Sequence, residues 1–284
     1  MSAQDSQTLE YQIKEAAHFF PGTVSAYARN IDTGADCGLE PDRRVRTAST
    51  IKLAIMAAVF TAVAEGRAKW NTRLKLREID KVAGSGVLGE FGHGMKFPVL
   101  DLVHLMIVVS DNTATNLLLD RFTAEYVNQQ MDRIGLTETR SLRKVRGDNP
   151  NTKTPSGWSR AGLIEENKRF GLGVSTPREM VTLLEKIERG QVVNEAASKQ
   201  MIEILKRQQY KHGIGRQMES EVASKSGSLD ALRSDAGIVY SKGGRIAIAV
   251  TVDDMAKTDY SPDNEGELLI SRLAQMLVAG LSRG

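Results

Sequence analysis

Three short motifs in this chain carry side chains that could together open an amide bond. A serine hydroxyl attacks a carbonyl carbon and forms an ester when a neighbouring base takes its proton. The three motifs supply a nucleophile, a base, a proton relay and an anion-binding group, so the sequence predicts covalent serine catalysis on an amide. They are, in chain order, Ser49-Thr50-Ile51-Lys52, Ser110-Asp111-Asn112 and Lys225-Ser226-Gly227.

The first motif stands at the start of a strongly apolar run, residues 51–60, which predicts a core helix. Positions three apart share a helix face, so Lys52 is expected one turn above Ser49. Burial beside other cations favours the neutral amine, which can take the serine proton. The alternative is a serine N-cap followed by a surface lysine, and the two further motifs make it less favoured. A second S-x-x-K pattern, Ser141 to Lys144, has no apolar run after it and is set aside.

The second motif follows another apolar run, residues 99–109, and precedes a predicted helix over residues 113–122. Asp111 is expected to cap that helix, a structural role. Ser110 and Asn112 flank the cap on an exposed loop. There Ser110 could pass a proton to a leaving nitrogen, and Asn112 could hold a substrate amide. An ordinary polar turn is the alternative for these two residues.

The third motif opens a segment that is typical of a strand. Lys225 and Ser226 would offer charge and a hydroxyl to a substrate carboxylate, and Gly227 allows another backbone to approach closely. The backbone N–H of Ser228 could pair with that of Ser49 as an oxyanion hole. The alternative for Lys225 is a solvated lysine on an edge strand.

Composition indicates a soluble globular protein and excludes several classes. Among 284 residues, 41% are hydrophobic and 26% charged, and 38 basic residues against 35 acidic ones give a net charge of +3. We therefore expect no nucleic-acid binding, and no apolar run is long enough to span a membrane. The single cysteine, Cys37, forms no intrachain disulfide. The four histidines are scattered, so we expect no catalytic metal and no cofactor.

Strand patterns occur near both ends of the chain, with helical patterns between them. Residues 8–20 and 265–281 predict terminal helices, and residues 23–32, 237–241 and 245–252 predict strands. From about residue 49 to 209 the pattern is helical, with Thr176, Pro177 and Glu179 marking one helix start as a capping box. We expect an α+β fold: an antiparallel sheet with terminal helices from residues 1–47 and 210–284, plus an inserted all-helical domain, residues 48–209. The motifs would meet in a cleft at their junction.

These motifs, with residues 110–118 and 176–180, resemble the class A β-lactamase-like serine hydrolases from about residue 23 to 281. The resemblance implies the same two-part fold and assigns Ser49 as nucleophile, Lys52 as base and Ser110 as relay. It assigns Asn112, Lys225 and Ser226 to substrate binding. It also implies a β-lactam or D-alanyl peptide substrate and a periplasmic or secreted location. The start of the sequence, Met1 to Asp5, does not look like a signal peptide, so we expect either a removed export signal or a cytoplasmic protein. We expect a monomer.

The sequence departs from this family at the residue that activates water. Class A enzymes carry Glu-x-x-Leu-Asn between the second motif and the Thr-Pro helix start, and no such string exists here. Alignment forward from residues 134–136 puts Val145 near the place of the glutamate and Asn149 near that of the asparagine. Alignment backward from Pro177 favours Glu165 or Glu166. For both glutamates the alternative is a solvated loop.

Three functions remain open on these grounds. We favour a serine β-lactamase, in which water releases the acyl group from Ser49. The missing glutamate favours a penicillin-binding D-alanyl-D-alanine peptidase with slow deacylation. The third is a sensor module that binds β-lactams or peptidoglycan without turnover. Arg233 is the candidate for the further cationic anchor of a substrate carboxylate, with a surface arginine beside Asp235 as its alternative.

Overall fold

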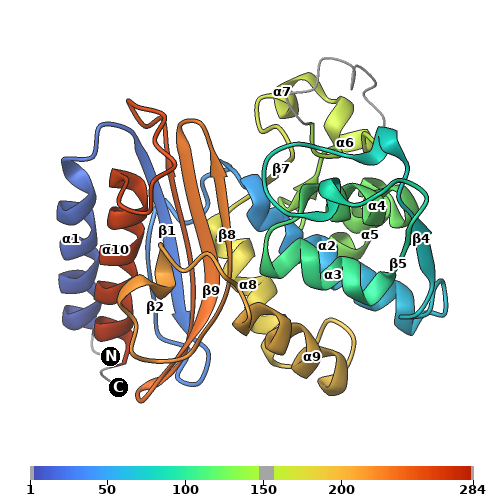
Figure 1. Ribbon diagram of the computed structural model, residues 1–284. Helices are drawn as coiled ribbons and strands as arrows, with labels where there is room; N and C mark the ends of the chain where they lie inside the picture. The colour runs from blue at the N-terminus through green and yellow to red at the C-terminus, as the bar shows by residue number, and fades with distance from the viewer. Residues whose placement is uncertain (1–2, 147–156, 283–284) are drawn as a thin grey trace.

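The computed structural model describes residues 3–146 and 157–282 of the chain. Its largest sheet has five antiparallel strands in the order β2-β1-β10-β9-β8 (Figure 1). The two ends of the chain build this sheet together, because β1 pairs with β10 along its whole length. The bounds are β1 Thr23–Asn30, β2 Asp36–Leu39, β8 Val222–Leu229, β9 Leu232–Ser241 and β10 Gly244–Asp253.

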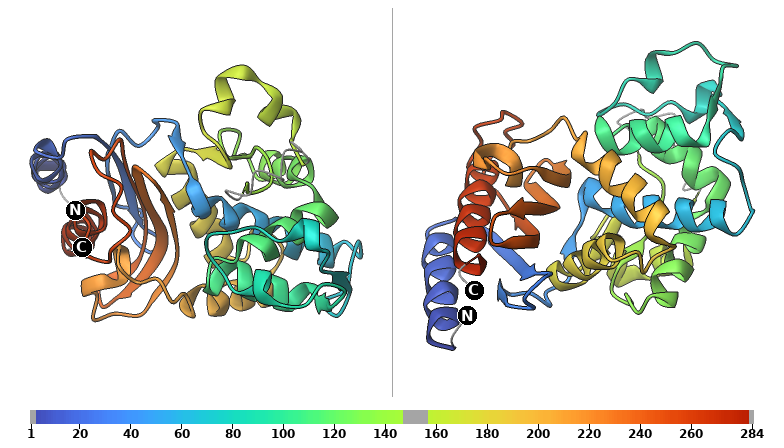
Figure 2. Two further views of the ribbon diagram at one scale, coloured as in Figure 1. Left: turned by 45° about the horizontal axis from the view of Figure 1, so that its top comes forward. Right: turned by 90° about the horizontal axis from the view of Figure 1, so that it is seen from below.

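Two terminal helices, α1 (Ala3–His18) and α10 (Glu265–Leu281), cover one face of this sheet (Figures 1 and 2). Every third or fourth residue of α10 is apolar, and Ile270, Leu273 and Leu277 are fully buried against Ile13 and Ile248. Asn264 caps α10 by accepting a hydrogen bond from the N–H of Glu267 at 3.0 Å. The α+β fold with an antiparallel sheet and terminal helices, predicted from the sequence, is confirmed.

The other face of the sheet packs against the helical part of the chain. Its central helix is α2 (Lys52–Ala64), whose residues 52–60 are all buried, which explains why that run is apolar throughout. None of the described helices is long and apolar enough to cross a membrane. The other helices are α3 Val99–Val108, α4 Asn112–Phe122, α5 Ala124–Arg133, α6 Arg160–Leu163, α7 Glu165–Lys168, α8 Pro177–Glu188, α9 Glu195–Lys206, and the 3-10 turns η1 Ala48–Ile51, η2 Glu78–Asp80, η3 Leu88–Glu90 and η4 Ile214–Gln217.

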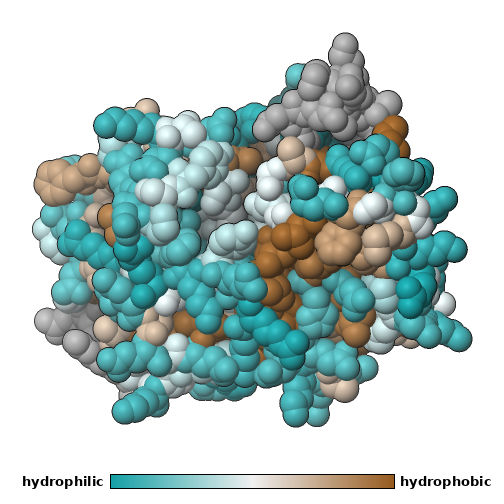
Figure 3. Space-filling view, viewed as in Figure 1, coloured by the Kyte–Doolittle hydropathy of each residue, from teal (hydrophilic) through white to brown (hydrophobic). Residues whose placement is uncertain are grey.

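The segment expected to be all helical also contains four short strands. Strand β4 (Arg73–Lys75) pairs with β5 (Lys96–Pro98), and β6 (Arg140–Ser141) pairs with β7 (Gly173–Ser175). Strand β7 also pairs with β3 (Val45–Arg46), which lies just before this segment. With two or three residues each, they are too short to show a two-residue periodicity. Figure 3 shows the face of the molecule that is turned to the viewer in Figure 1. Its surface is largely hydrophilic over the five-stranded sheet, whereas apolar side chains gather near the middle of the face.

Thr176 caps α8 as expected, because its hydroxyl accepts a hydrogen bond from the N–H of Glu179 at 3.1 Å. The reciprocal half of the predicted capping box is wrong. The Glu179 carboxylate instead accepts hydrogen bonds from the N–H of Glu138 at 2.9 Å and the hydroxyl of Thr139 at 2.6 Å. The Glu179 carboxylate thus binds a residue 40 positions earlier in the chain instead of its own helix terminus. A contact between such distant positions cannot be predicted from a local pattern.

Candidate active site

Ser49 lies in η1, a 3-10 turn that leads directly into α2, and its side chain is half-buried. The preceding residue, Ala48, has a φ of 46°, a conformation that L-residues rarely adopt. The Thr50 hydroxyl donates to the carbonyl of Thr47 at 2.7 Å and holds the turn closed. The strained turn thus fixes the backbone N–H of Ser49 in place.

Lys52 is fully buried, and its ammonium nitrogen binds the second motif directly. Nζ donates to the Ser110 carbonyl at 2.7 Å, to the Ser110 hydroxyl at 3.2 Å and to Oδ1 of Asn112 at 3.0 Å. Burial lowers the pKa of Lys52 well below its usual value, and the nearby Lys225 charge lowers it further, while Asp111 acts in the opposite direction. This shift favours the neutral amine, which is the form that can accept a proton.

The loop carrying the second motif is held by Asp111. Its carboxylate accepts hydrogen bonds from Ala114 N–H at 2.8 Å and from the N–H groups of Val87 and Leu88 at 2.7 Å each. The predicted N-cap of α4 is therefore confirmed, and the same carboxylate also fastens the segment before η3. Ser110 has a φ of 54° and is buried, so its carbonyl turns toward Lys52.

Strand β8 carries the third motif past the nucleophile turn. A Cβ on Gly227 would lie 2.8 Å from the backbone nitrogen of Ser49 and 2.9 Å from the carbonyl oxygen of Thr47. Only glycine allows this approach, because real Cβ contacts of that length essentially do not occur. The first and third motifs are therefore in backbone contact, although they are separated by more than 170 positions in the sequence.

Lys225 is fully buried beside this contact, and its Nζ donates to the carbonyl of Ser226 at 2.6 Å. Burial lowers the pKa of Lys225 to about 7, while the charge of Asp235 acts to raise it. Ser226 is half-buried, and Ser228 is exposed near the end of β8. A cation and hydroxyls thus lie together on the strand that touches the nucleophile turn.

Two other candidates do not join this group. Glu165 and Glu166 are exposed on the short α7, and the Glu165 carboxylate forms an ion pair with Lys168. Within the described residues, no hydrogen bond links either glutamate to the three motifs. Asn149 lies outside the described residues.

Arg233 is 1% exposed, so it is not the surface arginine considered as its alternative. Its guanidinium donates to the carbonyls of Leu229 and Leu232 at 2.6 Å each, and to that of Asp259. These bonds occupy the guanidinium on backbone oxygens, and its Cβ and Cγ lie against Gly266 of α10. The Arg233 guanidinium is therefore not free to bind a substrate carboxylate.

Asn116, one turn after Asn112 on α4, holds a residue that the forward alignment singled out. Its amide nitrogen donates to the Val145 carbonyl at 3.0 Å, and its Oδ1 accepts the Val145 N–H at 2.8 Å. Positions four apart share a helix face, so Asn116 and the Val145 backbone that it binds lie on the side of α4 that carries Asn112. The sequence signal for this role is the spacing of two asparagines, Asn112 and Asn116, one helix turn apart.

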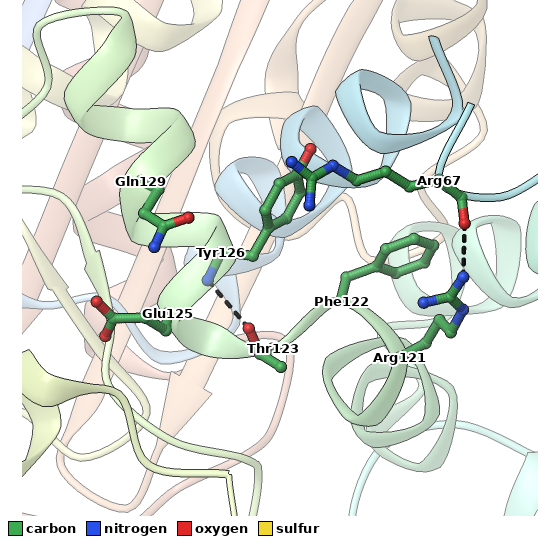
Figure 4. Close-up of a pocket in the computed structure, with 7 residues that line it drawn as sticks. All are labelled: Arg67, Arg121, Phe122, Thr123, Glu125, Tyr126 and Gln129. Atoms are coloured by element: carbon green, nitrogen blue, oxygen red, sulfur yellow. Dashed lines mark hydrogen bonds between the residues drawn. The ribbon is translucent and has the colours of Figure 1, made fainter. Parts of the chain in front are cut away.

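A hollow of about 290 Å³ lies at the far ends of the same helices (Figure 4). Arg67 follows α2, and Phe122 and Thr123 end α4, whereas both helices begin at the motifs. No motif residue lines this hollow, so it is not the site of the chemistry. Among the described residues, no group of three or more histidine, cysteine or acidic side chains could hold a metal ion.

Several known proteins resemble this chain over most of its length. The model of the Beta-lactamase enzyme family matches residues 8–281. The β-lactamase regulatory protein BlaB of Streptomyces cacaoi is 24% identical, and the match covers 96% of this chain and 97% of that protein. A β-lactamase structure from Sphaerobacter thermophilus is 28% identical with a TM-score of 0.81, covering 99% and 98% of the two chains. The acyl-enzyme complex of a PBP-A mutant with penicillin G is 26% identical with a TM-score of 0.82, covering 98% and 97%.

Proposed function

Because the chain belongs to the Beta-lactamase enzyme family, we propose that it is a serine hydrolase that opens β-lactams and D-alanyl-D-alanine peptides through an ester on Ser49. One observation carries the proposal. The buried Lys52 amine, one residue beyond the Ser49 turn, is hydrogen-bonded to both Ser110 and Asn112. The periplasmic or secreted location implied by the family is part of the same proposal.

Acylation follows from these contacts. Neutral Lys52 takes the proton of Ser49 while Oγ attacks the carbonyl carbon of the amide. The N–H groups of Ser49 and Ser228 stabilise the negative charge on the carbonyl oxygen. The carbon–nitrogen bond then breaks, and the Ser110 hydroxyl gives its proton to the departing nitrogen. Lys52, 3.2 Å from that hydroxyl, returns a proton to Ser110.

Substrate orientation is the role we propose for the remaining motif residues. Asn112 offers its amide to the acylamide group of a substrate, and Lys225 with Ser226 offers charge and a hydroxyl to its carboxylate. Because the pKa of Lys225 is about 7, its charge is lost just above neutral pH. Arg233 is no longer proposed as an anchor, since backbone carbonyls occupy its guanidinium.

The fate of the ester depends on a base for water, and the structure supports slow release of β-lactams. The residue that Asn116 fixes on the Asn112 side of α4 is Val145, which cannot accept a proton. After cleavage of a peptide, the leaving D-alanine departs and makes room for water. After cleavage of a β-lactam, the leaving amine stays tethered to the acyl group and obstructs that approach. We therefore propose a penicillin-binding peptidase that β-lactams trap as a persistent ester.

The β-lactamase favoured by the sequence analysis is the second candidate, supported by the family match and by the β-lactamase among the similar structures. It requires Glu165 or Glu166 to leave its exposed position on α7 and enter the site. Replacing each glutamate in turn with glutamine shows which one activates water, because only loss of the true base should stop β-lactam turnover. Replacing both would leave a peptidase unchanged.

The test mixes the protein with a chromogenic cephalosporin. A stoichiometric burst, with the mass of the drug added to the protein, supports the trapped ester, whereas continuous turnover supports the lactamase. Release of D-alanine from a stem peptide then supports a peptidase, and a burst without that release indicates a sensor. Ser49→Ala should abolish the adduct. Ser141→Ala, at the S-x-x-K pattern that was set aside, is the matched control and should retain it.

Val145→Glu tests the reason for slow release. A carboxylate placed there by the Asn116 clamp should shorten the lifetime of the ester by at least about tenfold, below the roughly 10²–10⁴ that general base catalysis contributes at its best. The acylation rate should change little, because the ester forms before this group acts. An unchanged lifetime would show that the missing carboxylate is not what limits release.

A further inference from the structure

The hollow drawn in Figure 4 lies at the ends of α2 and α4 and takes no part in the chemistry proposed above. Its volume of about 290 Å³ is close to the lower limit, about 300 Å³, of the sites that hold small molecules in proteins. The segment after α2, the end of α4 and the first half of α5 supply its wall. The hollow is thus large enough for a small ligand, and the side chains on its wall indicate which charge that ligand would carry.

Arg121 lies on the last turn of α4 and is held in place by two contacts. Its Nη2 donates to the backbone carbonyl of Arg67 at 2.5 Å, as a dashed line in Figure 4 shows. Its guanidinium carbon lies 5.4 Å from the centre of the Phe122 ring. Within residues 3–146 and 157–282, its Nε and Nη1 hydrogens have no acceptor and no carboxylate pairs with it. A fixed guanidinium group therefore retains donors for a ligand.

Arg67, three residues after the end of α2, is held in a similar way. Its Nε donates to the Glu65 carboxylate at 2.8 Å, and its guanidinium carbon lies 4.7 Å from the centre of the Tyr126 ring. Its two terminal nitrogens have no acceptor in the part of the chain that the structure describes. Glu65 also accepts hydrogen bonds from Arg133 at 2.5 Å and from the Tyr126 hydroxyl at 3.0 Å. One carboxylate is thus shared by two arginines, and it does not neutralise both.

Positive charge exceeds negative charge around the hollow. Glu125 is the acidic side chain on the wall, and it accepts hydrogen bonds from the backbone N–H of Arg160 at 2.9 Å and from its Nε at 2.7 Å. The wall and its ion-pair partners together hold four arginines and two glutamates, a net charge of +2. The first turn of α5 faces the same space, and the helix dipole adds to the positive potential there.

We propose that this hollow binds a small organic dianion, with Arg67 and Arg121 as the residues that hold its acidic groups. A dianion matches the net charge of the cluster. Guanidinium groups bind carboxylates and phosphates alike, because two of their N–H groups can reach two oxygens at once. The shared chemistry therefore admits a dicarboxylate or a phosphate monoester. The Gln129 amide, which also lines the hollow, can donate to the same ligand or accept from it.

The first experiment titrates the protein at pH 7 and low ionic strength with succinate and, separately, with glycerol 3-phosphate. Spectra of the ¹H–¹⁵N backbone amides follow the binding. We expect saturable shifts at Arg67, Thr123 and Tyr126 with a Kd of about 1 mM, because the two arginines are exposed and solvent screens their charges. The tighter of the two probes identifies the acidic group. Shifts that do not saturate, or equal shifts with sodium chloride at the same ionic strength, would overturn the proposal.

The second experiment repeats this titration with single substitutions on the wall. Arg67→Gln and Arg121→Gln should each weaken binding by about tenfold, because each removes a charged donor. Arg73→Gln is the matched control. Arg73 is an exposed arginine of β4 whose guanidinium also donates to a backbone carbonyl, that of Lys96 at 3.2 Å, but it does not line the hollow. Equal weakening in all three variants would mean that only the overall charge of the protein matters.

Gln129 provides a test that does not depend on removing a structural contact. Its side chain is exposed and has no hydrogen-bond partner within the described ranges, so its replacement should leave the fold intact. Gln129→Lys should tighten the binding of succinate severalfold, and Gln129→Glu should weaken it by a similar factor. A role of this wall in folding alone predicts no such opposition. If Arg121→Gln fails to fold, the opposite effects of these two variants decide the question.

The proposed function and this site fail separately. Succinate also carries carboxylates, so Lys225 in the proposed substrate site is a competing place for it to bind. Lys225→Met should bind both probes as the wild type does, and loss of binding in that variant would overturn the proposal. Absence of an ester on Ser49 would refute the proposed function and leave the shifts at the hollow unchanged. Acylation by Gln129→Lys should proceed at the wild-type rate, since no motif residue lines the hollow.

Discussion

Gly227→Ala tests the contact that joins the nucleophile to the sheet. The added methyl carbon would lie 2.8 Å from the Ser49 nitrogen and 2.9 Å from the Thr47 oxygen, against an ordinary contact of at least 3.4 Å. Strand β8 and the η1 turn must therefore separate by about half an ångström, and the atoms that must move are backbone. The two proposed oxyanion donors, the N–H groups of Ser49 and Ser228, lie on opposite sides of this contact and would separate with it.

The expected loss is large for the reaction and modest for the fold. Displacing or losing one oxyanion donor costs about 10²–10³ in rate, so we expect acylation to slow by about 10²-fold, or about 2.7 kcal/mol in the barrier. Overpacking of this kind costs about 1–3 kcal/mol in the free energy of unfolding. Stopped-flow absorbance with a chromogenic cephalosporin measures the first quantity, and urea unfolding measures the second.

Gly92→Ala is the control, because a Cβ at Gly92 has nothing within 4 Å and its backbone φ is not in the left-handed region. It should acylate and unfold as the wild type does. Wild-type acylation by folded Gly227→Ala would refute the reasoning, since it would mean that the close approach of β8 has no part in the chemistry.

Three further predictions follow from the contacts of single side chains. Asp111→Ala should lower the free energy of unfolding by about 3–5 kcal/mol in urea titrations, because three N–H groups lose their acceptor and two of these hydrogen bonds are buried. Asp101→Ala, exposed on α3, should change it by less than about 0.5 kcal/mol. Lys52→Arg should abolish ester formation by mass spectrometry as fully as Lys52→Ala does, because a guanidinium keeps its proton and cannot act as the base; an ester formed by the arginine variant would contradict that role. Glu267 should make the protein less stable as pH rises from about 4.5 to 7, because its pKa is raised to about 7 in the folded protein and the unfolded chain releases that proton first. Glu267→Gln should therefore flatten the pH dependence of the free energy of unfolding, measured in urea, by at most about 3 kcal/mol. Parallel curves for the two proteins would contradict the buried charge.

The three motifs and the fold were predictable because each leaves a local trace. A run such as residues 51–60 is apolar at nearly every position, which only a buried helix explains, and the cap at Asp111 and the helix start at Thr176 follow from side-chain chemistry. The pairing of strands from the two chain ends followed from their positions alone. The short strands of the helical part escaped prediction because two or three residues carry no period.

What the sequence left undecided depends on contacts between distant segments. The role of Arg233 was ambiguous because its partners are backbone carbonyls, which every residue has. Two of them belong to its own hairpin and one to the segment before α10. Glu165 and Glu166 were plausible because proximity in sequence cannot tell an exposed carboxylate from one aimed into a cleft. Asn116 was the informative residue. A buried amide needs partners for both its N–H₂ and its oxygen, and here a single residue, Val145, satisfies both.

The two hydrogen bonds between Asn116 and the Val145 backbone bear on whether an ester in this fold would be hydrolysed or retained. Asn116 binds only the backbone of residue 145, so the geometry of the loop at that point does not depend on which side chain the residue carries. The acylating group is equally independent of it, because Lys52 contacts Ser110 and Asn112 through its hydrogen bonds and none of these involves Val145. We therefore expect formation and hydrolysis of the proposed ester to be separable in this fold, so that a change of one side chain alters the second step without disturbing the first. A loss of acylation in Val145→Glu would show instead that the two steps share this position.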